Sequence, residues 1–152
     1  MARRNTSADN DSRRYYEWLD HAETDLRAAR MLRGVGADSR TVVYHCHQVL
    51  EKSLKCFLLF KSNRHVDGHN ITYLMRQAAR SDKSFNKYID RTPPFNSYYI
   101  ETRYPTDLPF EITEKDLEQA FSLAEEVYGA VARAIMYEIK EDIEEDEEAE
   151  EK

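Results

Sequence analysis

Apolar residues recur at helical spacing in three long segments of this chain, and this periodicity restricts the fold more than any other feature of the sequence. The first segment starts near Tyr15 and ends at Gly34 and Gly36, the second covers about residues 39–62, and the third follows Thr113. No segment alternates apolar and polar residues as a strand does, and no internal repeat is present. The sequence therefore predicts an all-α antiparallel bundle.

Residues that cap helices mark where the elements begin. Asp38 or Ser39 is suited to start the second long helix, and Thr113 is suited to start the last one. Asn70 is suited to cap a shorter helix through residues 71–78, which a weaker turn follows at residues 85–89. A Pro-Pro pair at residues 93 and 94 begins one more short piece, which leads into YYIETRYP at residues 98–105.

Charge separates the ends of the chain from its body. Residues 138–152 hold ten acidic and two basic side chains, a net charge of -8, so the remaining residues carry 20 basic and 19 acidic groups, or +1. The body is nearly neutral, which neither supports nor excludes a polyanionic ligand. We expect a disordered segment at residues 1–12, one helical domain at residues 13–140, and a disordered acidic tail at residues 141–152.

The two cysteines indicate a reducing compartment. Cys46 and Cys56 lie ten residues apart in one predicted helix, which places their backbones about 15 Å apart and beyond the reach of a disulfide. No apolar run is long enough to cross a membrane, and the first residues contain no apolar stretch typical of a secretion signal. We expect a soluble cytoplasmic protein without membrane contact.

A metal site or a cofactor loop is not predicted. His65 and His69 flank Asp67-Gly68, but the turn opposes the convergence of the two imidazoles, and no third strong ligand is near in the sequence. The chain also lacks a glycine-rich phosphate loop, paired zinc cysteines and a hydrolase serine elbow. We therefore expect no metal and no cofactor.

The second helix carries a polar arc opposite its apolar side. At 100° per residue, the arc contains His45, Gln48, Glu51, Lys52 and Lys55. One interpretation is an ordinary solvated face with an ion pair between Glu51 and Lys55, and the other is a functional ridge. His47 lies at the edge of the apolar side, which favours a hydrogen-bonded structural histidine.

Four sequence blocks occur in order along the chain, namely WLDHAETDLRAAR, HQVLEKSLKCFLL, HNITYL and YYIETRYP. Together they resemble the HEPN domain family, named for higher eukaryotes and prokaryotes nucleotide binding, and the resemblance covers about residues 15–137. It implies a four- to five-helix up-and-down bundle that commonly forms homodimers. Members of this branch are often paired with a minimal nucleotidyltransferase, and other members are ribonucleases, frequently toxins.

The nuclease signature of the family is missing at its expected place. Ribonuclease members carry an arginine and, after a short spacer, a histidine, whereas no histidine follows Arg103 in RYPTDLPFEIT. Similar spacings occur elsewhere by chance, as the pairs Arg14–His21, Arg40–His45, Arg40–His47 and Arg64–His69. The pair Arg40–His45 is the best alternative for catalysis, because a cation at a helix start and an imidazole one turn later suit a phosphate and a ribose hydroxyl.

The resemblance and the residue chemistry together give a candidate nucleotide or RNA site. Its residues are Lys52, Lys55, His69, Tyr99, Arg103 and Tyr104, with Tyr98 as a further stacking face. A structural interpretation competes with it, in which Arg103 pairs with Glu51, Tyr104 locks the loop through its hydroxyl and Glu51 and His47 are structural polar residues. A surface for a partner protein is a third interpretation.

Three functions from different classes remain open. The first is a nucleotide- or RNA-binding interaction module that acts with a minimal nucleotidyltransferase in a toxin–antitoxin or defence-type system. The second is a metal-independent ribonuclease that uses Arg40 and His45. The third is a purely structural dimerisation domain. The absence of the nuclease signature after Arg103 favours the first.

Overall fold

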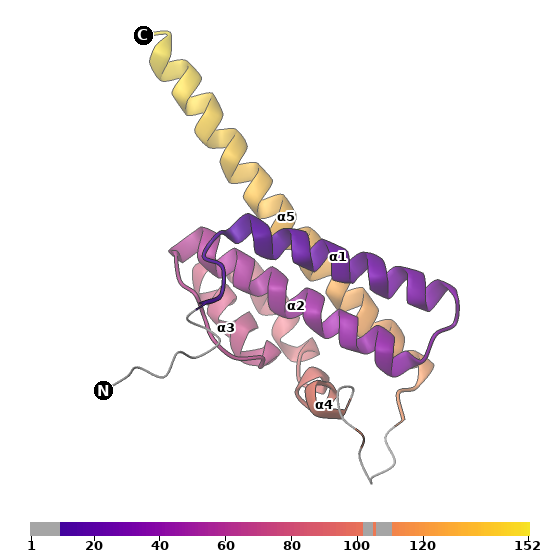
Figure 1. Ribbon diagram of the computed structural model, residues 1–152. Coiled ribbons are helices and arrows are strands. Elements are labelled where there is room, and N and C mark those ends of the chain that lie inside the picture. Colours follow the sequence, from indigo (N-terminus) through magenta and orange to yellow (C-terminus); the bar gives the residue numbers. More distant parts are fainter. Residues whose placement is uncertain (1–9, 102–104, 106–110) are drawn as a thin grey trace.

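All regular elements are helices in the part of the chain that the structure, a computed structural model, describes, namely residues 10–101, 105 and 111–152. The elements in chain order are α1 (Tyr15–Gly34), α2 (Ser39–Ser62), α3 (Ile71–Ser81), the 3-10 helix η2 (Lys83–Arg91), α4 (Pro94–Glu101) and α5 (Glu114–Glu150). The helices α1, α2 and α5 form the long axis of the bundle, and the shorter elements pack beside α2 (Figure 1). The predicted all-α bundle is confirmed.

Helix α2 is the central element. It contacts α1, α3, α4 and α5, and side chains such as Leu50, Leu54 and Phe57 are fully buried between them. The Phe57 ring lies 4.6 Å from the Phe85 ring in η2, measured between centroids. Each such buried side chain stabilises the fold by about 1.5–3 kcal/mol. Polar residues on α2 are therefore fixed in place by a rigid scaffold.

The predicted helix caps are confirmed at three positions. The Asp38 side chain accepts a hydrogen bond from the Arg40 backbone N–H, and Asn70 accepts one from the Tyr73 backbone N–H. Thr113 forms a reciprocal capping box with Asp116 at the start of α5. These bonds satisfy backbone donors that have no partner within the helix, so the caps fix where α2, α3 and α5 begin.

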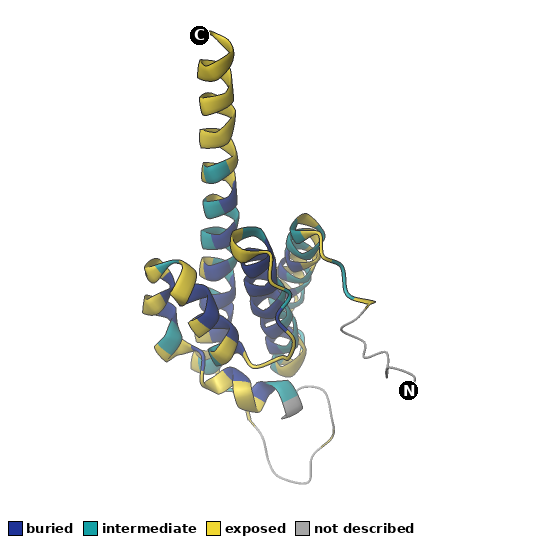
Figure 2. Ribbon diagram, turned by 90° about the vertical axis from the view of Figure 1, so that its left-hand side faces the viewer, coloured by how far each residue is buried: buried dark blue, intermediate teal, exposed yellow. Residues whose placement is uncertain are grey.

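Helix α5 is longer than the sequence predicts. It continues to Glu150, so the acidic residues 141–150 are helical rather than disordered, and they project beyond the bundle with exposed side chains (Figure 2). Glutamate has a high helix propensity, and extending a helix already formed in the bundle avoids the cost of nucleation. The expected disorder of residues 1–12 concerns mainly residues 1–9, which lie outside the described part.

Cys46 and Cys56 are free and buried on α2. Burial raises the pKa of each thiol from about 9 to about 12, so both thiols stay protonated and unreactive at neutral pH. Among the helices of the described residues, none is long and apolar enough to cross a membrane.

Candidate functional site

Glu51, His69 and Tyr99 meet where α2, the loop before α3 and α4 come together. The Nδ1 atom of His69 is hydrogen-bonded to the Oε1 atom of Glu51. The His69 ring also stacks on the Tyr99 ring, with 4.8 Å between the ring centroids and 13° between the ring planes. The Glu51 side chain is 7% exposed and the His69 side chain is 53% exposed. A buried carboxylate thus orients an imidazole that remains open to solvent.

The chain turn before His69 depends on Gly68. Gly68 has a φ of +96°, a backbone conformation that side chains with a Cβ rarely adopt. The turn brings His69 back over α2, where its side chain meets Glu51. The turn at Asp67-Gly68 argued against a metal site in the sequence, and in the structure it positions the His69 imidazole beside Glu51.

His47 supports the site from within the core. It is fully buried on α2, and its Nε2 atom lies 3.1 Å from the backbone carbonyl oxygen of His69. Because a carbonyl only accepts, Nε2–H of His47 is the donor. The His47 ring also lies 5.3 Å from the Tyr99 ring, between centroids. His47 therefore binds the backbone of His69 and contacts the Tyr99 ring. These contacts are those of a structural polar residue.

A cavity of about 270 Å³ opens beside the stacked pair. It is lined by His69, Asn70, Asn96 and Tyr99. The Oδ1 atom of Asn70 is already used as the cap of α3, which leaves its amide N–H groups as donors, while Asn96 is exposed on α4. An imidazole, a phenol ring and two amide groups thus border one cavity, where they combine aromatic surface with hydrogen-bonding groups.

Lys52 and His45 belong to a separate polar cluster centred on Asp25 of α1. Lys52 Nζ lies 2.6 Å from one Asp25 carboxylate oxygen, and His45 Nδ1 lies 2.9 Å from the other. The Asp25 side chain is only 13% exposed, so both oxygens are bonded to α2 in a mostly buried setting. This cluster links α1 to α2, and Lys52 is not among the residues that line the cavity beside Tyr99.

Lys55 differs most from the expected solvated ridge. It is buried, with its Nζ atom 5.5 Å from the centroid of the Trp18 ring on α1. An ammonium over an indole face is attracted by the electrons of the ring. Glu51 and Lys55, which one interpretation of the sequence paired with each other, thus contact different residues, His69 and Trp18.

Arg40 and His45, the alternative catalytic pair, bind different partners. Arg40 is exposed and forms an ion pair with Asp38 at 2.9 Å, and hydrogen bonds from Arg40 lower the pKa of the Asp38 carboxyl. His45 is bound instead to Asp25. Arg64, the arginine of another matching spacing, donates to Gln77.

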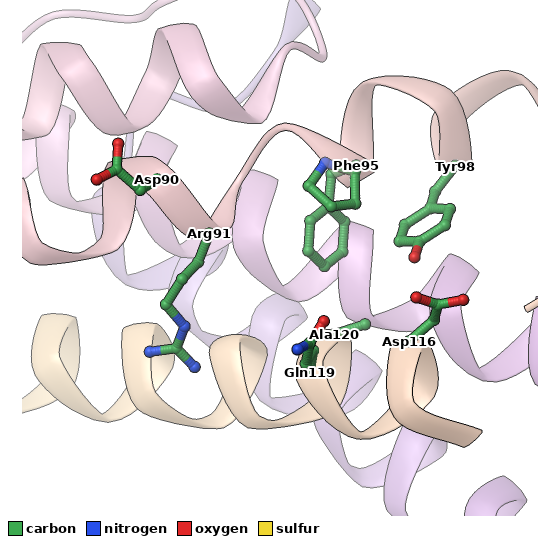
Figure 3. A pocket seen from close by; sticks show the side chains of 8 residues that line it. Asp90, Arg91, Phe95, Tyr98, Asp116, Gln119 and Ala120 are labelled. Carbon is green, nitrogen blue, oxygen red and sulfur yellow. The ribbon is translucent and has the colours of Figure 1, made fainter. Parts of the chain in front are cut away.

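A second cavity of about 220 Å³ lies between η2, α4 and α5 (Figure 3). Its lining residues are Asp90, Arg91, Pro94, Phe95, Tyr98, Asp116, Gln119 and Ala120. Arg91 is paired with Glu126 of α5, while Asp90 and Asp116 bring two carboxylates to the lining. Two carboxylates disfavour a phosphate group at this cavity.

Arg103 and Tyr104 lie outside the described residues, so the predicted pairing of Arg103 with Glu51 stays a prediction. Within the described part, no group of three or more His, Cys, Asp and Glu side chains is arranged to hold a metal ion.

Sequence reasoning missed Asp25, Asn96 and the bond between Glu51 and His69. Asp25 could have been found, because it shares the buried face of α1 with Ala22 and Leu26, three residues before and one after it. A carboxylate on such a face needs a cation from the facing helix. Asn96 carries no comparable signal.

Comparisons with known proteins agree with the fold. The HEPN domain profile matches residues 15–148. The crystal structure of TT1696 from Thermus thermophilus is similar with a TM-score of 0.69 and 26% identity, over 80% of this chain and 98% of that one. The structure of ST0689, an archaeal HEPN homologue, has a TM-score of 0.62 and 23% identity over the same shares. Comparison with curated proteins gives no match. This chain belongs to the HEPN domain family.

Proposed function

We propose that this protein is a binding module for a nucleotide or single-stranded RNA, with its ligand site at Glu51, His69 and Tyr99. The observation that carries the proposal is the open His69 imidazole, held by a buried carboxylate and stacked on Tyr99 beside a cavity. Stacking on aromatic faces is the sequence-tolerant way to bind bases, and amide groups at the rim suit the polar edge of a base.

Charge for the phosphate would come from outside the described cluster. Lys52 is bonded to Asp25, and Lys55 lies buried under Trp18, so neither is available as a free surface cation. We propose Arg103 as the source of this charge, with Tyr104, the next residue in the sequence, as a further member of the site. If Arg103 binds phosphate, Arg103→Ala will weaken binding and flatten its salt dependence while the melting temperature stays nearly unchanged.

The partner proposal is an interaction with a minimal nucleotidyltransferase, in a toxin–antitoxin or defence-type system, with the chain itself as a homodimer. Family membership and the missing nuclease signature after Arg103 support it. The test is co-purification of the tagged protein with the product of the adjacent gene. A nucleotidyltransferase that elutes with the tagged chain is the expected result, and separate elution at micromolar concentration would contradict it.

A second candidate function is metal-independent RNA cleavage through Glu51 and His69. The bond of Nδ1–H to the Glu51 carboxylate leaves Nε2 as the nitrogen with the lone pair in the neutral ring. Such an imidazole is suited to take a proton from a ribose 2′-hydroxyl. RNA incubated with the protein and a metal chelator tests this function: cleavage lost in His69→Ala supports an enzyme, and intact RNA supports binding alone.

A further inference from the structure

Helix α5 carries a short exposed apolar stripe where it leaves the bundle. Met136, Ile139 and Ile143 lie at positions i, i+3 and i+7, which places them on one side of the helix. Their exposed fractions are 69%, 37% and 52%. Figure 2 shows the end of α5 projecting away from the other helices, with most of its surface exposed. The stripe therefore has no cover within the described part of the chain.

The stripe is bordered on the same helix by Tyr137, Lys140, Glu144 and Glu147, which form one open surface with it. Residues 138–152 around and beyond it hold ten acidic and two basic side chains. An apolar stripe flanked by carboxylates on one helix has the arrangement of one half of a pair of helices.

The charge of this surface decides which partner can bind it. A second copy of α5 would bring the same net charge of -8 over residues 138–152, and like charges that face one another across a helix pair are destabilising. Nucleic acid and anionic lipid surfaces are repelled for the same reason. A helix with an apolar face and lysines or arginines beside it complements both the stripe and the carboxylates.

We propose that the protruding end of α5 is a docking surface for a basic amphipathic helix of a partner protein. Ile139 and Ile143 supply the apolar contact, and the surrounding glutamates attract the partner and fix its orientation. The surface lies near the C-terminal end of α5 and does not include His69 or Tyr99. It is thus independent of the nucleotide or RNA site, and either can fail without the other.

The test uses the full chain and a synthetic amidated peptide with leucines at helical spacing and lysines at the remaining positions. Its binding is measured by fluorescence anisotropy to the wild type and to a variant with Met136→Ser, Ile139→Ser and Ile143→Ser. The variant keeps every charge and replaces only exposed side chains. Met31→Ser with Val35→Ser, two exposed apolar residues at the end of α1 and after it, is the matched control.

The proposal predicts that the wild type and the control bind the peptide alike and that the triple variant binds at least tenfold more weakly. A peptide with glutamates in place of its lysines should not bind. Equal binding to the wild type and the triple variant would overturn the proposal, because charge alone would then explain it. A dimeric wild type together with a monomeric triple variant would also overturn the proposal, because the surface would then bind a second copy of this chain.

Discussion

The bond between Glu51 and His69 makes a quantitative prediction about the stability of the site. Glu51→Gln keeps the shape of the side chain and an acceptor oxygen for Nδ1–H of His69 but removes the negative charge. A hydrogen bond to a charged group contributes about 1.5–3 kcal/mol, and a neutral one about 0.5–1.5 kcal/mol. Because the His69 ring is half exposed, water offsets part of the difference. We expect a loss of about 1 kcal/mol.

A double-mutant cycle isolates this interaction from other effects. The free energies of unfolding in urea are measured for the wild type, Glu51→Gln, His69→Ala and the double variant. The expected coupling is about 1 kcal/mol, whereas the exposed pair of Glu23 and Arg27 should give less than about 0.5 kcal/mol. A coupling between Glu51 and His69 no larger than that of the exposed control pair would refute the reasoning.

The remaining predictions concern the rest of the chain. Asp25→Ala leaves the mostly buried Lys52 without its carboxylate and should lower the free energy of unfolding by about 1 to 3 kcal/mol in urea denaturation. Cys46 and Cys56 should resist a thiol reagent at about pH 8 until the protein is unfolded. Burial raises the pKa of both thiols, so their contribution to the free energy of unfolding is complete below about pH 9 and is lost as the pH rises toward 12. The free energy of unfolding should therefore fall less steeply with pH in Cys46→Ala than in the wild type. Deleting residues 144–152, which are exposed, should change the free energy of unfolding by less than about 0.5 kcal/mol.

The fold was predictable where local chemistry and tertiary packing agree. Asp38, Asn70 and Thr113 act as caps in the structure because their side chains bind backbone N–H groups a few residues ahead, which is a local interaction. The length of α5 was not predictable in this way. A run of glutamates has both the composition of a disordered tail and a high helix propensity, and the helix that precedes it decides between the two.

The candidate site was predictable only in part, because side-chain partners depend on which helices meet. The arc on α2 was predicted as a solvated face or a functional ridge, but α1 covers the side where Lys55 and Trp18 meet, so that lysine is buried. His69 and Tyr99 were predicted as members of one candidate site, but their direct contact was not predicted. Their stacking depends on how α4 packs beside the turn at Gly68, a contact between distant parts of the sequence.

The most direct test of the central claim is to titrate the wild type, His69→Ala and Tyr99→Leu with a labelled single-stranded RNA oligomer. The same three proteins are titrated separately with a nucleoside triphosphate. Tyr73→Leu, an exposed tyrosine on α3, is the matched control. Loss of base stacking costs about 1–3 kcal/mol, so each site variant should bind about 5- to 150-fold more weakly, while thermal melts confirm that it is folded. No binding by the wild type, or equal binding by the wild type, both site variants and the control, would contradict a nucleotide or RNA site at His69 and Tyr99.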